Sequence, residues 1–248
     1  GEEVSFTTMS TEGNTNGYDW VDLGLPSGLK WAKYNIGATA PEQYGDYYSW
    51  GEIETKDSYA WGNCTTMGAS LDDISGNAEY DVARKKWGDA WRMPTKEEQE
   101  VSFKRQIEIA KRVGKPLIIH SRDAMKITFD TLIETDAFNL GGVMHSFSGS
   151  VEMAKEFVKR GYYLGIGGPV TFTNAKDPKL VVSEIDLKHI ITETDSPYLT
   201  PHPYRGKMNS PKYIPLIAKK IAELKNIDLE TLQKQVLENV KSLFKIEV

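Results

Sequence analysis

Three polar side chains that follow apolar runs could together bind a metal ion. His120, His145 and Asp195 each stand at the end of a short run rich in β-branched and other apolar residues. Imidazole nitrogens and carboxylate oxygens are common protein ligands of divalent cations. If the runs form neighbouring strands, these side chains supply a ligand set for a divalent metal, which we expect to be magnesium, manganese or zinc.

The runs themselves have the composition of buried strands. They cover residues 116–119, 141–144 and 189–194, and a fourth run, 162–168, ends on glycines. Helical patterns lie between them, and strands that alternate with helices are typical of parallel βαβ units. In such sheets the functional side chains gather at the carboxyl ends of the strands. The pattern therefore predicts that the two histidines and the aspartate lie at one edge of a parallel sheet.

Apolar residues at helical spacing predict four helices in the same part of the chain, over residues 103–113, 151–158, 214–224 and 229–244. Gly114 and Pro116 are expected to end the first helix. Ser150 is expected to cap the second. We interpret these apolar stripes as core.

Composition and charge divide the chain into two unlike parts. All six tryptophans precede residue 100, and all four histidines follow it. Residues 1–100 hold 8 basic and 18 acidic side chains, whereas the rest of the chain holds 22 and 17. We expect a domain boundary near residue 97, with domains 1–97 and 98–248. The mildly positive second part suits a polyanionic substrate, although many proteins without one carry as much charge.

Five motifs of the second part carry a family resemblance. They are IIHSRDA (118–124), GGVMHSFSGS (141–150), GGPVTF (167–172), ETDSPYL (193–199) and HPYRGK (202–207). From about residue 97 onward the chain resembles the TatD-type metal-dependent deoxyribonucleases, hydrolases built on a TIM-like barrel. The resemblance implies a metal-assisted phosphodiesterase site, with His120 and His145 as metal ligands and Asp195 as ligand and base.

The resemblance also indicates that the barrel is incomplete. A complete barrel has eight βα units and about 250 residues, so about 150 residues hold four or five units. The family's His-x-His pair on the first strand and its glutamate on the third are missing here. Glu52 lies in a Gly-Glu-Ile sequence like the family's, but inside a different motif, and we do not expect it to be a ligand. The sequence thus predicts weakened metal binding and weak or no turnover.

Several residues near the expected strand ends allow two interpretations. Arg122, Arg205 and Lys207 could hold a phosphate, or they could form a salt bridge to Asp123 and solvated loops. We interpret Glu193 as a paired structural carboxylate on the same pleat face as Asp195.

Two further histidines are open to interpretation. His202 could contact substrate or pack a loop. His189 is expected at the surface, at the strand end opposite the site.

The N-terminal part is rich in turns and aromatic residues, with one helix expected near residues 81–87. The segments VDLGLPSGLKWA (21–32), APEQYGDYYSWGE (40–52) and WGDAWRMPTKEE (87–98) resemble the FISUMP, or major paralogous, domain of bacterial cell surfaces. That resemblance implies a C-type-lectin-like fold with a structural or ligand-binding role. The aromatic clusters could stack on sugars, or could fill a small core. Cys64, the only cysteine, is expected to be a free buried thiol.

The expected fold class is therefore an α/β partial TIM-like barrel, preceded by a turn-rich, mainly β segment. Three functions compete: a divalent-metal phosphodiesterase, a surface ligand-binding module, and a fusion of two truncated domains without joint activity.

Docking of the N-terminal part or homodimerisation is expected to cover the open half barrel. The second part suggests a cytoplasmic protein and the first a cell-envelope or secreted one. No apolar run approaches the length of a membrane span.

Overall fold

The computed structural model describes residues 11–25, 27–57, 63–66, 68–69, 71 and 73–247. Pro26 and Trp61, which belong to the aromatic N-terminal part, lie outside the described residues. The chain forms two compact units, Gly1–Arg105 and Gln106–Val248. Within the described residues, no helix is both long and apolar enough to cross a membrane.

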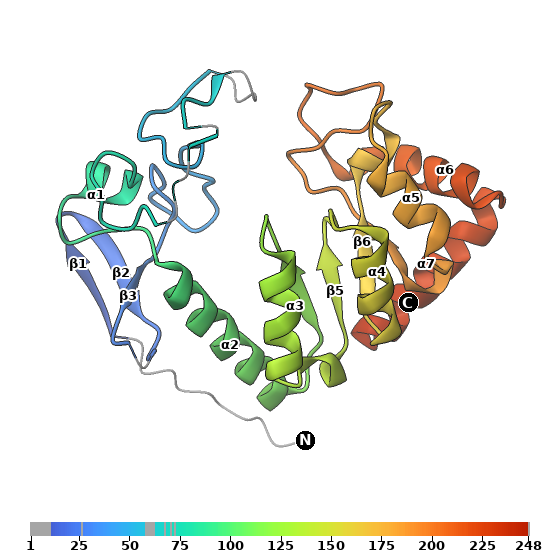
Figure 1. Ribbon diagram of the computed structural model, residues 1–248, viewed down its shortest axis with the longest axis horizontal. Helices are drawn as coiled ribbons and strands as arrows, with labels where there is room; N and C mark the ends of the chain where they lie inside the picture. The colour runs from blue at the N-terminus through green and yellow to red at the C-terminus, as the bar shows by residue number, and fades with distance from the viewer. Residues whose placement is uncertain are drawn as a thin grey trace. The chain divides into compact units, whose positions relative to one another are not determined.

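The first unit contains a three-stranded antiparallel sheet of order β1-β2-β3, formed by β1 (Glu12–Thr15), β2 (Tyr18–Asp22) and β3 (Lys30–Ala32) (Figure 1). Asn16 and Gly17 connect the first two strands, both with positive φ. An Asn-Gly pair in this conformation is the preferred two-residue hairpin turn, because its twist matches that of the strands. The small sheet agrees with the expectation of short strands in this part.

Helix α1 (Val82–Trp87) lies where the sequence predicts a helix, near residues 81–87. Asp81 caps it, since its carboxylate accepts a hydrogen bond from the backbone N–H of Arg84 at 3.0 Å. Trp87 and Trp91 are buried and form a small core cluster with Ala83. These two tryptophans therefore fill the core, as the structural interpretation of the aromatic clusters expects.

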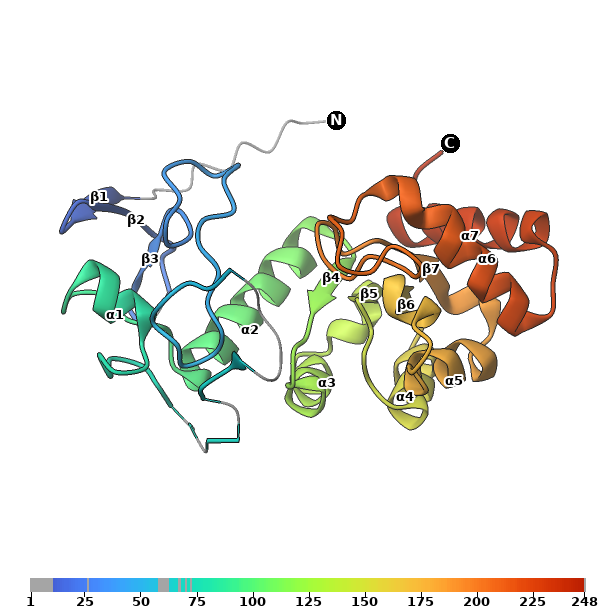
Figure 2. The same cartoon turned by 90° about the horizontal axis from the view of Figure 1, so that it is seen from above.

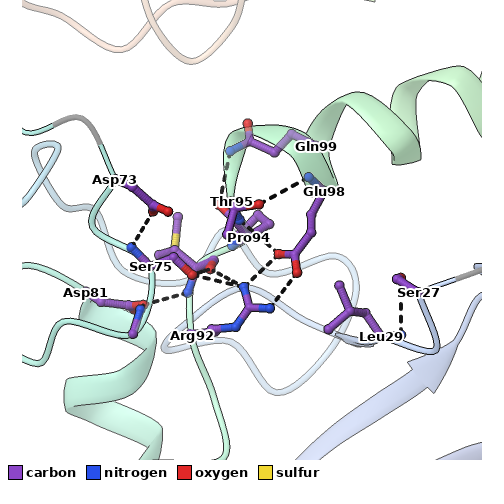
Figure 3. Close-up of polar contacts among 12 residues, drawn as sticks. Ser27, Leu29, Asp73, Ser75, Asp81, Arg92, Pro94, Thr95, Glu98 and Gln99 are labelled. Carbon is purple, nitrogen blue, oxygen red and sulfur yellow. Dashed lines mark hydrogen bonds and ion pairs between the residues drawn. The ribbon is translucent and has the colours of Figure 1, made fainter.

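Helix α2 (Lys96–Val113) begins with a capping box. The backbone N–H of Glu98 donates to Thr95 Oγ1 at 3.2 Å, and the backbone N–H of Thr95 donates to a Glu98 carboxylate oxygen at 2.9 Å (Figure 3). The helix ends before Gly114, which has a positive φ of 62°, at the position predicted from the sequence.

The second unit contains a four-stranded parallel sheet of order β4-β5-β6-β7. Its strands are β4 (Leu117–His120), β5 (Gly142–His145), β6 (Tyr163–Ile166) and β7 (Ile190–Thr192). The sheet confirms the predicted parallel βαβ arrangement and holds the number of strands expected from the length of this part.

Helices α3 (Met125–Glu134), α4 (Val151–Lys159) and α5 (Asp177–Glu184) alternate with the strands and lie along one face of the sheet (Figure 2). Helices α6 (Ile214–Lys225) and α7 (Leu229–Phe244) complete the unit. The connections also contain short 3-10 helices: η2 (Ala137–Leu140), η3 (Gly168–Thr171), η4 (Leu187–His189) and η5 (Pro211–Tyr213).

The apolar stripes of these helices form the core, as predicted. The Ser150 hydroxyl accepts a hydrogen bond from the Met153 N–H at 3.3 Å and so caps α4. The fully buried residues include Phe157 of α4, Ile217 and Ile221 of α6, and Leu232 of α7. Val113 and Leu229 were expected in the stripes but are exposed, because they lie in the terminal turns of their helices.

Strand β7 is shorter at both ends than the run predicted from the sequence, residues 189–194. Strand β7 spans only Ile190–Thr192, and His189 belongs to the preceding 3-10 turn η4. His189 is half-buried rather than at the surface, and burial lowers the pKa of its imidazole. Its Nδ1 is buried and makes no hydrogen bond within the described part of the chain.

Candidate functional site

His145, the last residue of β5, lies between two carboxylates. Its Nδ1 is 2.6 Å from Glu193 Oε2, and its Nε2 is 3.0 Å from Asp195 Oδ1. Burial acts to lower the pKa of His145, but the two carboxylates outweigh burial and raise the pKa above its ordinary value. Both ring nitrogens can donate only in the imidazolium form, so this arrangement favours a protonated ring.

Glu193 is the more buried of the two carboxylates. Burial raises the pKa of its carboxyl above the ordinary value, although the neighbouring His145 acts in the opposite direction. Its second oxygen, Oε1, is buried and has no hydrogen-bond partner among the described residues. A buried carboxylate oxygen without a donor is uncommon and indicates a place where a further partner is expected.

Gly165 of β6 makes room for the Glu193 carboxylate. A Cβ atom on Gly165 would lie 2.6 Å from Glu193 Oε2, so the carboxylate would have to shift. From the sequence, Gly165, Gly167 and Gly168 are expected to form a turn or to bring backbone amides near an anion; Gly165 instead lies in strand β6. Its position in a glycine-rich strand next to the Glu-Thr-Asp motif is the signal that could have indicated its role beside Glu193.

Left-handed backbone marks the loops that follow the strands. Ser146, directly after β5, has φ 47°, and Asp195, after β7, has φ 55°. Such conformations are costly for residues other than glycine and often occur at functional sites. The prediction that Glu193 and Asp195 share a pleat face is wrong, because β7 ends at Thr192 and the chain turns at Asp195. This turn brings both carboxylates to opposite sides of His145.

His120 lies beside His145 at the same edge of the sheet. The two residues are paired in register, and their ring centroids are 5.9 Å apart. His120 and Asp195 both line a pocket of about 260 Å³. The other lining residues come from the strand ends and the loops after them: Ser121, Arg122, Ser146, Phe147, Ser148, Ile166, Gly167, Pro169, Val170, Pro178 and Leu199. The structure thus brings the three predicted ligands to one place.

The three side chains do not converge on a single point. Among the described residues, no group of three or more histidine, cysteine, aspartate or glutamate side chains is arranged to hold a metal ion. The chemistry of His145 and Asp195 nevertheless fits one. Their 3.0 Å separation is close to the roughly 3.4 Å between two ligands of a tetrahedral ion with bonds of about 2.1 Å. His120 is the ligand whose approach is incomplete, and the ligand set stays a prediction.

The predicted phosphate-binding residues have different surroundings. Arg122 lines the pocket, and its side chain is 82% exposed. Its guanidinium lies 3.5 Å from the Asp123 carboxylate, so it forms the salt bridge that was the alternative to phosphate binding. Arg205 stacks its guanidinium over the Phe172 ring at 4.1 Å. Lys207 lies 5.6 Å from the centre of a tyrosine ring. Of the three, only Arg122 lines the pocket.

His202 is anchored by its backbone. Its N–H donates to Thr171 Oγ1 at 2.8 Å, and the residue is exposed. The contact positions the loop that carries Arg205 and Lys207, which agrees with the loop-packing interpretation of His202.

Glu52 has a structural environment in the first unit. One carboxylate oxygen accepts hydrogen bonds from Lys56 Nζ at 2.7 Å, and from the Thr65 N–H and hydroxyl at 2.6 and 2.7 Å. These donors lower the pKa of Glu52 to about 2.

Cys64 is only half-buried, and a contact with Thr66 lowers the pKa of its thiol.

A parallel sheet with polar side chains at its carboxyl edge is common to (β/α) barrels and open α/β folds. Residues 88–245 match the family described as TatD related DNase, and the chain belongs to this family. The resemblance predicted from the sequence motifs of this part is thereby confirmed.

Two relatives illustrate the match. The chain is 48% identical over 156 residues to the uncharacterized metal-dependent hydrolase YabD of Bacillus subtilis, which covers 63% of this chain and 61% of that protein. It is 37% identical over 153 residues to the uncharacterized metal-dependent hydrolase YcfH of Escherichia coli, which covers 62% and 58%. The chain thus spans about three fifths of the length of these relatives.

Solved structures give the same fold. The crystal structure of the TatD homologue YJJV from Escherichia coli K12 is similar with a TM-score of 0.57 and 28% identity, over 61% of this chain and 59% of that one. A TatD-family hydrolase from Entamoeba histolytica is similar in fold, with a TM-score of 0.53 and 20% identity, over 60% and 57%.

Proposed function

We propose that the second unit acts as a divalent-metal-dependent phosphodiesterase on DNA, with a weakened site. The observation that carries this proposal is the position of His145 between Glu193 and Asp195, at the carboxyl edge of a TatD-family sheet. A metal-binding histidine commonly donates its second ring N–H to a carboxylate, which orients the ring. Glu193 is the carboxylate that would accept the second ring N–H of His145, at Nδ1.

The proposed roles follow from the geometry. His145 Nε2 and Asp195 Oδ1, with His120 beside them, would hold the ion. A bound divalent metal polarises a phosphoryl oxygen and lowers the pKa of bound water to about 7. Asp195 can also accept a proton at its carboxylate from an attacking water. By holding Nδ1, Glu193 keeps Nε2 of His145 directed toward Asp195, which lines the pocket. Two imidazoles among three ligands favour zinc or manganese over magnesium.

The charge of the loop after the site supports a polyanionic substrate. Residues 196–213, which precede α6, contain no aspartate or glutamate and three lysines or arginines. Tyr204 and Tyr213 stack at 5.0 Å between ring centroids, and Leu199 of the same loop lines the pocket. Lysine and arginine side chains bind phosphates, and exposed aromatic rings stack on bases. This loop is therefore the proposed substrate-binding surface, with Arg205 and Lys207 as phosphate contacts.

The site is proposed to be weak because the barrel is short. The described residues contain four parallel strands, whereas a complete barrel has eight. The ligands that the resemblance places on the first and third strands of the family are not in this chain, so a second metal ion would lack its protein ligands. Without a two-metal clamp on the attacking and leaving oxygens, turnover is expected to be slow.

Elemental analysis of the purified full chain tests this proposal. We expect close to one equivalent of zinc or manganese in the parent protein and none after His120, His145 and Asp195 are all changed to alanine. His202→Ala, which removes an exposed histidine of the same unit, should retain the metal. A parent protein without metal, or a triple variant that keeps it, would refute the proposed site. Cleavage of single-stranded DNA and of a chromogenic phosphodiester should follow the metal content.

We also propose that a second copy of the chain, or the first unit, covers the open edge of the sheet. Strand β4 is the terminal strand of the described sheet, and its Ile118 is 65% exposed. An edge strand with an exposed apolar side chain is a ready site for association. Light scattering distinguishes a dimer that Ile118→Lys dissociates from a monomer that the substitution leaves unchanged.

A further inference from the structure

The first unit contains a larger pocket than the one at the strand ends. Its volume is about 480 Å³, which lies in the range of about 300–1,000 Å³ typical of small-molecule sites. Aromatic side chains from β3, the loop after it, α1 and the loop after α1 contribute to its walls. These are Trp31, Tyr34, Trp87 and Trp91.

Trp31 carries a hydrogen-bond donor without an acceptor. Its indole Nε1 is buried and has no partner among the described residues. Two neighbouring indoles are satisfied, since Trp20 Nε1 and Trp91 Nε1 each donate to Thr15 at 3.1 Å. Buried donors are paired in nearly all native structures, so the unpaired indole of this lining residue is the candidate donor to a ligand oxygen. Because Nε1 is closed to solvent, the Trp31 side chain must shift for a ligand to reach it.

The charged side chains of the pocket already have partners. Lys33 is paired with Glu12 at 2.8 Å. The Arg92 guanidinium holds the Glu98 carboxylate through two hydrogen bonds of 2.6 and 2.5 Å (Figure 3). Lys30 Nζ lies over the Trp20 ring at 3.8 Å. Three of these four side chains are paired with an opposite charge, and an anion would have to displace a partner from Lys33 or Arg92, so the pocket favours an uncharged ligand.

Two amides of the lining offer the remaining polar groups. Gln43 Oε1 accepts hydrogen bonds from the Thr39 N–H and hydroxyl at 2.7 and 3.1 Å, which leaves the amide hydrogens of Gln43 to donate. Asn35 Nδ2 donates to the Tyr44 carbonyl at 3.2 Å, which leaves Asn35 Oδ1 to accept. The pocket thus combines donors and an acceptor, and a hydroxyl group is the ligand group that can satisfy both.

We propose that this pocket binds an uncharged sugar ring. The faces of aromatic rings are electron-rich and attract the polarised C–H groups on one face of a pyranose. The ring hydroxyls then accept from Trp31 Nε1 and Gln43 and donate to Asn35. The site is separate from the proposed phosphodiesterase site, because every residue that lines it belongs to the first unit.

Titration of the full chain with glucose, N-acetylglucosamine and cellobiose tests the proposal, with saturation-transfer NMR and tryptophan fluorescence as readouts. We expect at least one of these sugars to bind with a Kd in the millimolar range or below. Trp31→Phe keeps an aromatic ring but removes the indole N–H, and it should weaken binding about five- to tenfold. Gln43→Ala, at an exposed position that leaves the core intact, should weaken binding severalfold.

Trp50→Phe provides the matched control, because Trp50 is exposed and does not line the pocket. It should bind the sugar like the parent chain. Adenosine monophosphate is the charged comparison and should bind more weakly than the best sugar. The proposal is overturned if no sugar binds below about 20 mM, if adenosine monophosphate binds more tightly, or if both pocket variants bind like the parent.

Discussion

Each unit contains a largely buried glutamate, and the two have opposite surroundings. In the first unit, one oxygen of Glu52 accepts hydrogen bonds from the ammonium of Lys56 and from two groups of Thr65, and these lower the pKa of the carboxyl to about 2. In the second unit, Glu193 contacts His145 with one oxygen. Glu193 Oε1 and Glu52 Oε2 are both buried without a hydrogen bond among the described residues, but Glu52 Oε2 lies 2.6 Å from the Lys56 ammonium, whereas no ion pair is recorded there for Glu193 Oε1. Burial raises the pKa of Glu193 instead.

The difference separates a structural carboxylate from a candidate functional one. A glutamate that ties two segments together is surrounded by donors and loses its basicity. A glutamate that orients a histidine at the edge of a pocket retains basicity and lacks some of its partners. The contrast between Glu52 and Glu193 therefore supports a functional site in the second unit.

The largest expected effect is on metal affinity. Glu193→Gln keeps the shape of the side chain but removes the charge that orients and polarises His145. We expect it to lower the affinity for zinc or manganese about 10- to 100-fold. Glu52→Gln should leave metal affinity unchanged and should destabilise the first unit. Isothermal titration measures the metal affinity of both variants. An unchanged affinity for Glu193→Gln would contradict the proposal that Glu193 orients His145.

Gly165→Ala tests the space that the sheet leaves for Glu193. Its new Cβ would lie 2.6 Å from the carboxylate oxygen that binds His145, so the carboxylate must move. We expect a loss of about 1–3 kcal/mol in the free energy of unfolding, together with weaker metal binding. Urea denaturation and metal titration measure the two effects.

Gly167→Ala is the matched control for Gly165→Ala. Its Cβ would lie 3.6 Å or more from the same glutamate, at an ordinary contact distance. We expect it to cost less than about 1 kcal/mol. Equal losses for the two variants would mean that the Glu193 carboxylate does not depend on the space at Gly165.

Removing positive charge from the loop of the second unit should weaken DNA binding. Arg205→Gln and Lys207→Gln should each reduce the slope of log K against log salt by about one, because each removes one phosphate contact. Lys241→Gln, on α7, is the control and should leave the slope unchanged. Fluorescence anisotropy with labelled single-stranded DNA at several salt concentrations measures the slopes. Identical slopes for all variants would exclude this loop as the binding surface.

Much of the second unit could be predicted from the sequence, because local signals agree there. Apolar periodicity, the Ser150 cap and the Gly114 stop predict its helices, and the positions of His120 and His145 at strand ends follow from the βαβ order. These features depend on residues that are close in the chain.

Other features depend on contacts between distant segments. The bond between His145 and Glu193 joins residues 48 positions apart, and it requires both the space at Gly165 and the left-handed turn at Asp195. No periodic pattern encodes such a combination. The pocket around Trp31 likewise joins β3 to the segment after α1, so the sequence predicted aromatic clusters but not their arrangement.

The smallest expected effect is a pH dependence with opposite sign at the two sites. The pKa of His145 is raised by folding, so its protonated form contributes stability that is complete below about pH 6.5 and is lost as the pH rises through the folded pKa. The pKa of Glu52 is lowered to about 2, so its ionised form contributes stability that is present above about pH 4.5 and is lost as the pH falls toward 2.

Urea denaturation between pH 3 and pH 9 can separate these contributions. We expect the deficit of His145→Gln relative to the parent chain to be largest below pH 6.5 and to shrink at alkaline pH. The deficit of Glu52→Gln should be largest above pH 4.5 and should shrink in acid. If both deficits were independent of pH, the carboxylates around His145 would not stabilise its imidazolium form. The contrast between the two glutamates would then be one of position only, without consequence for proton binding.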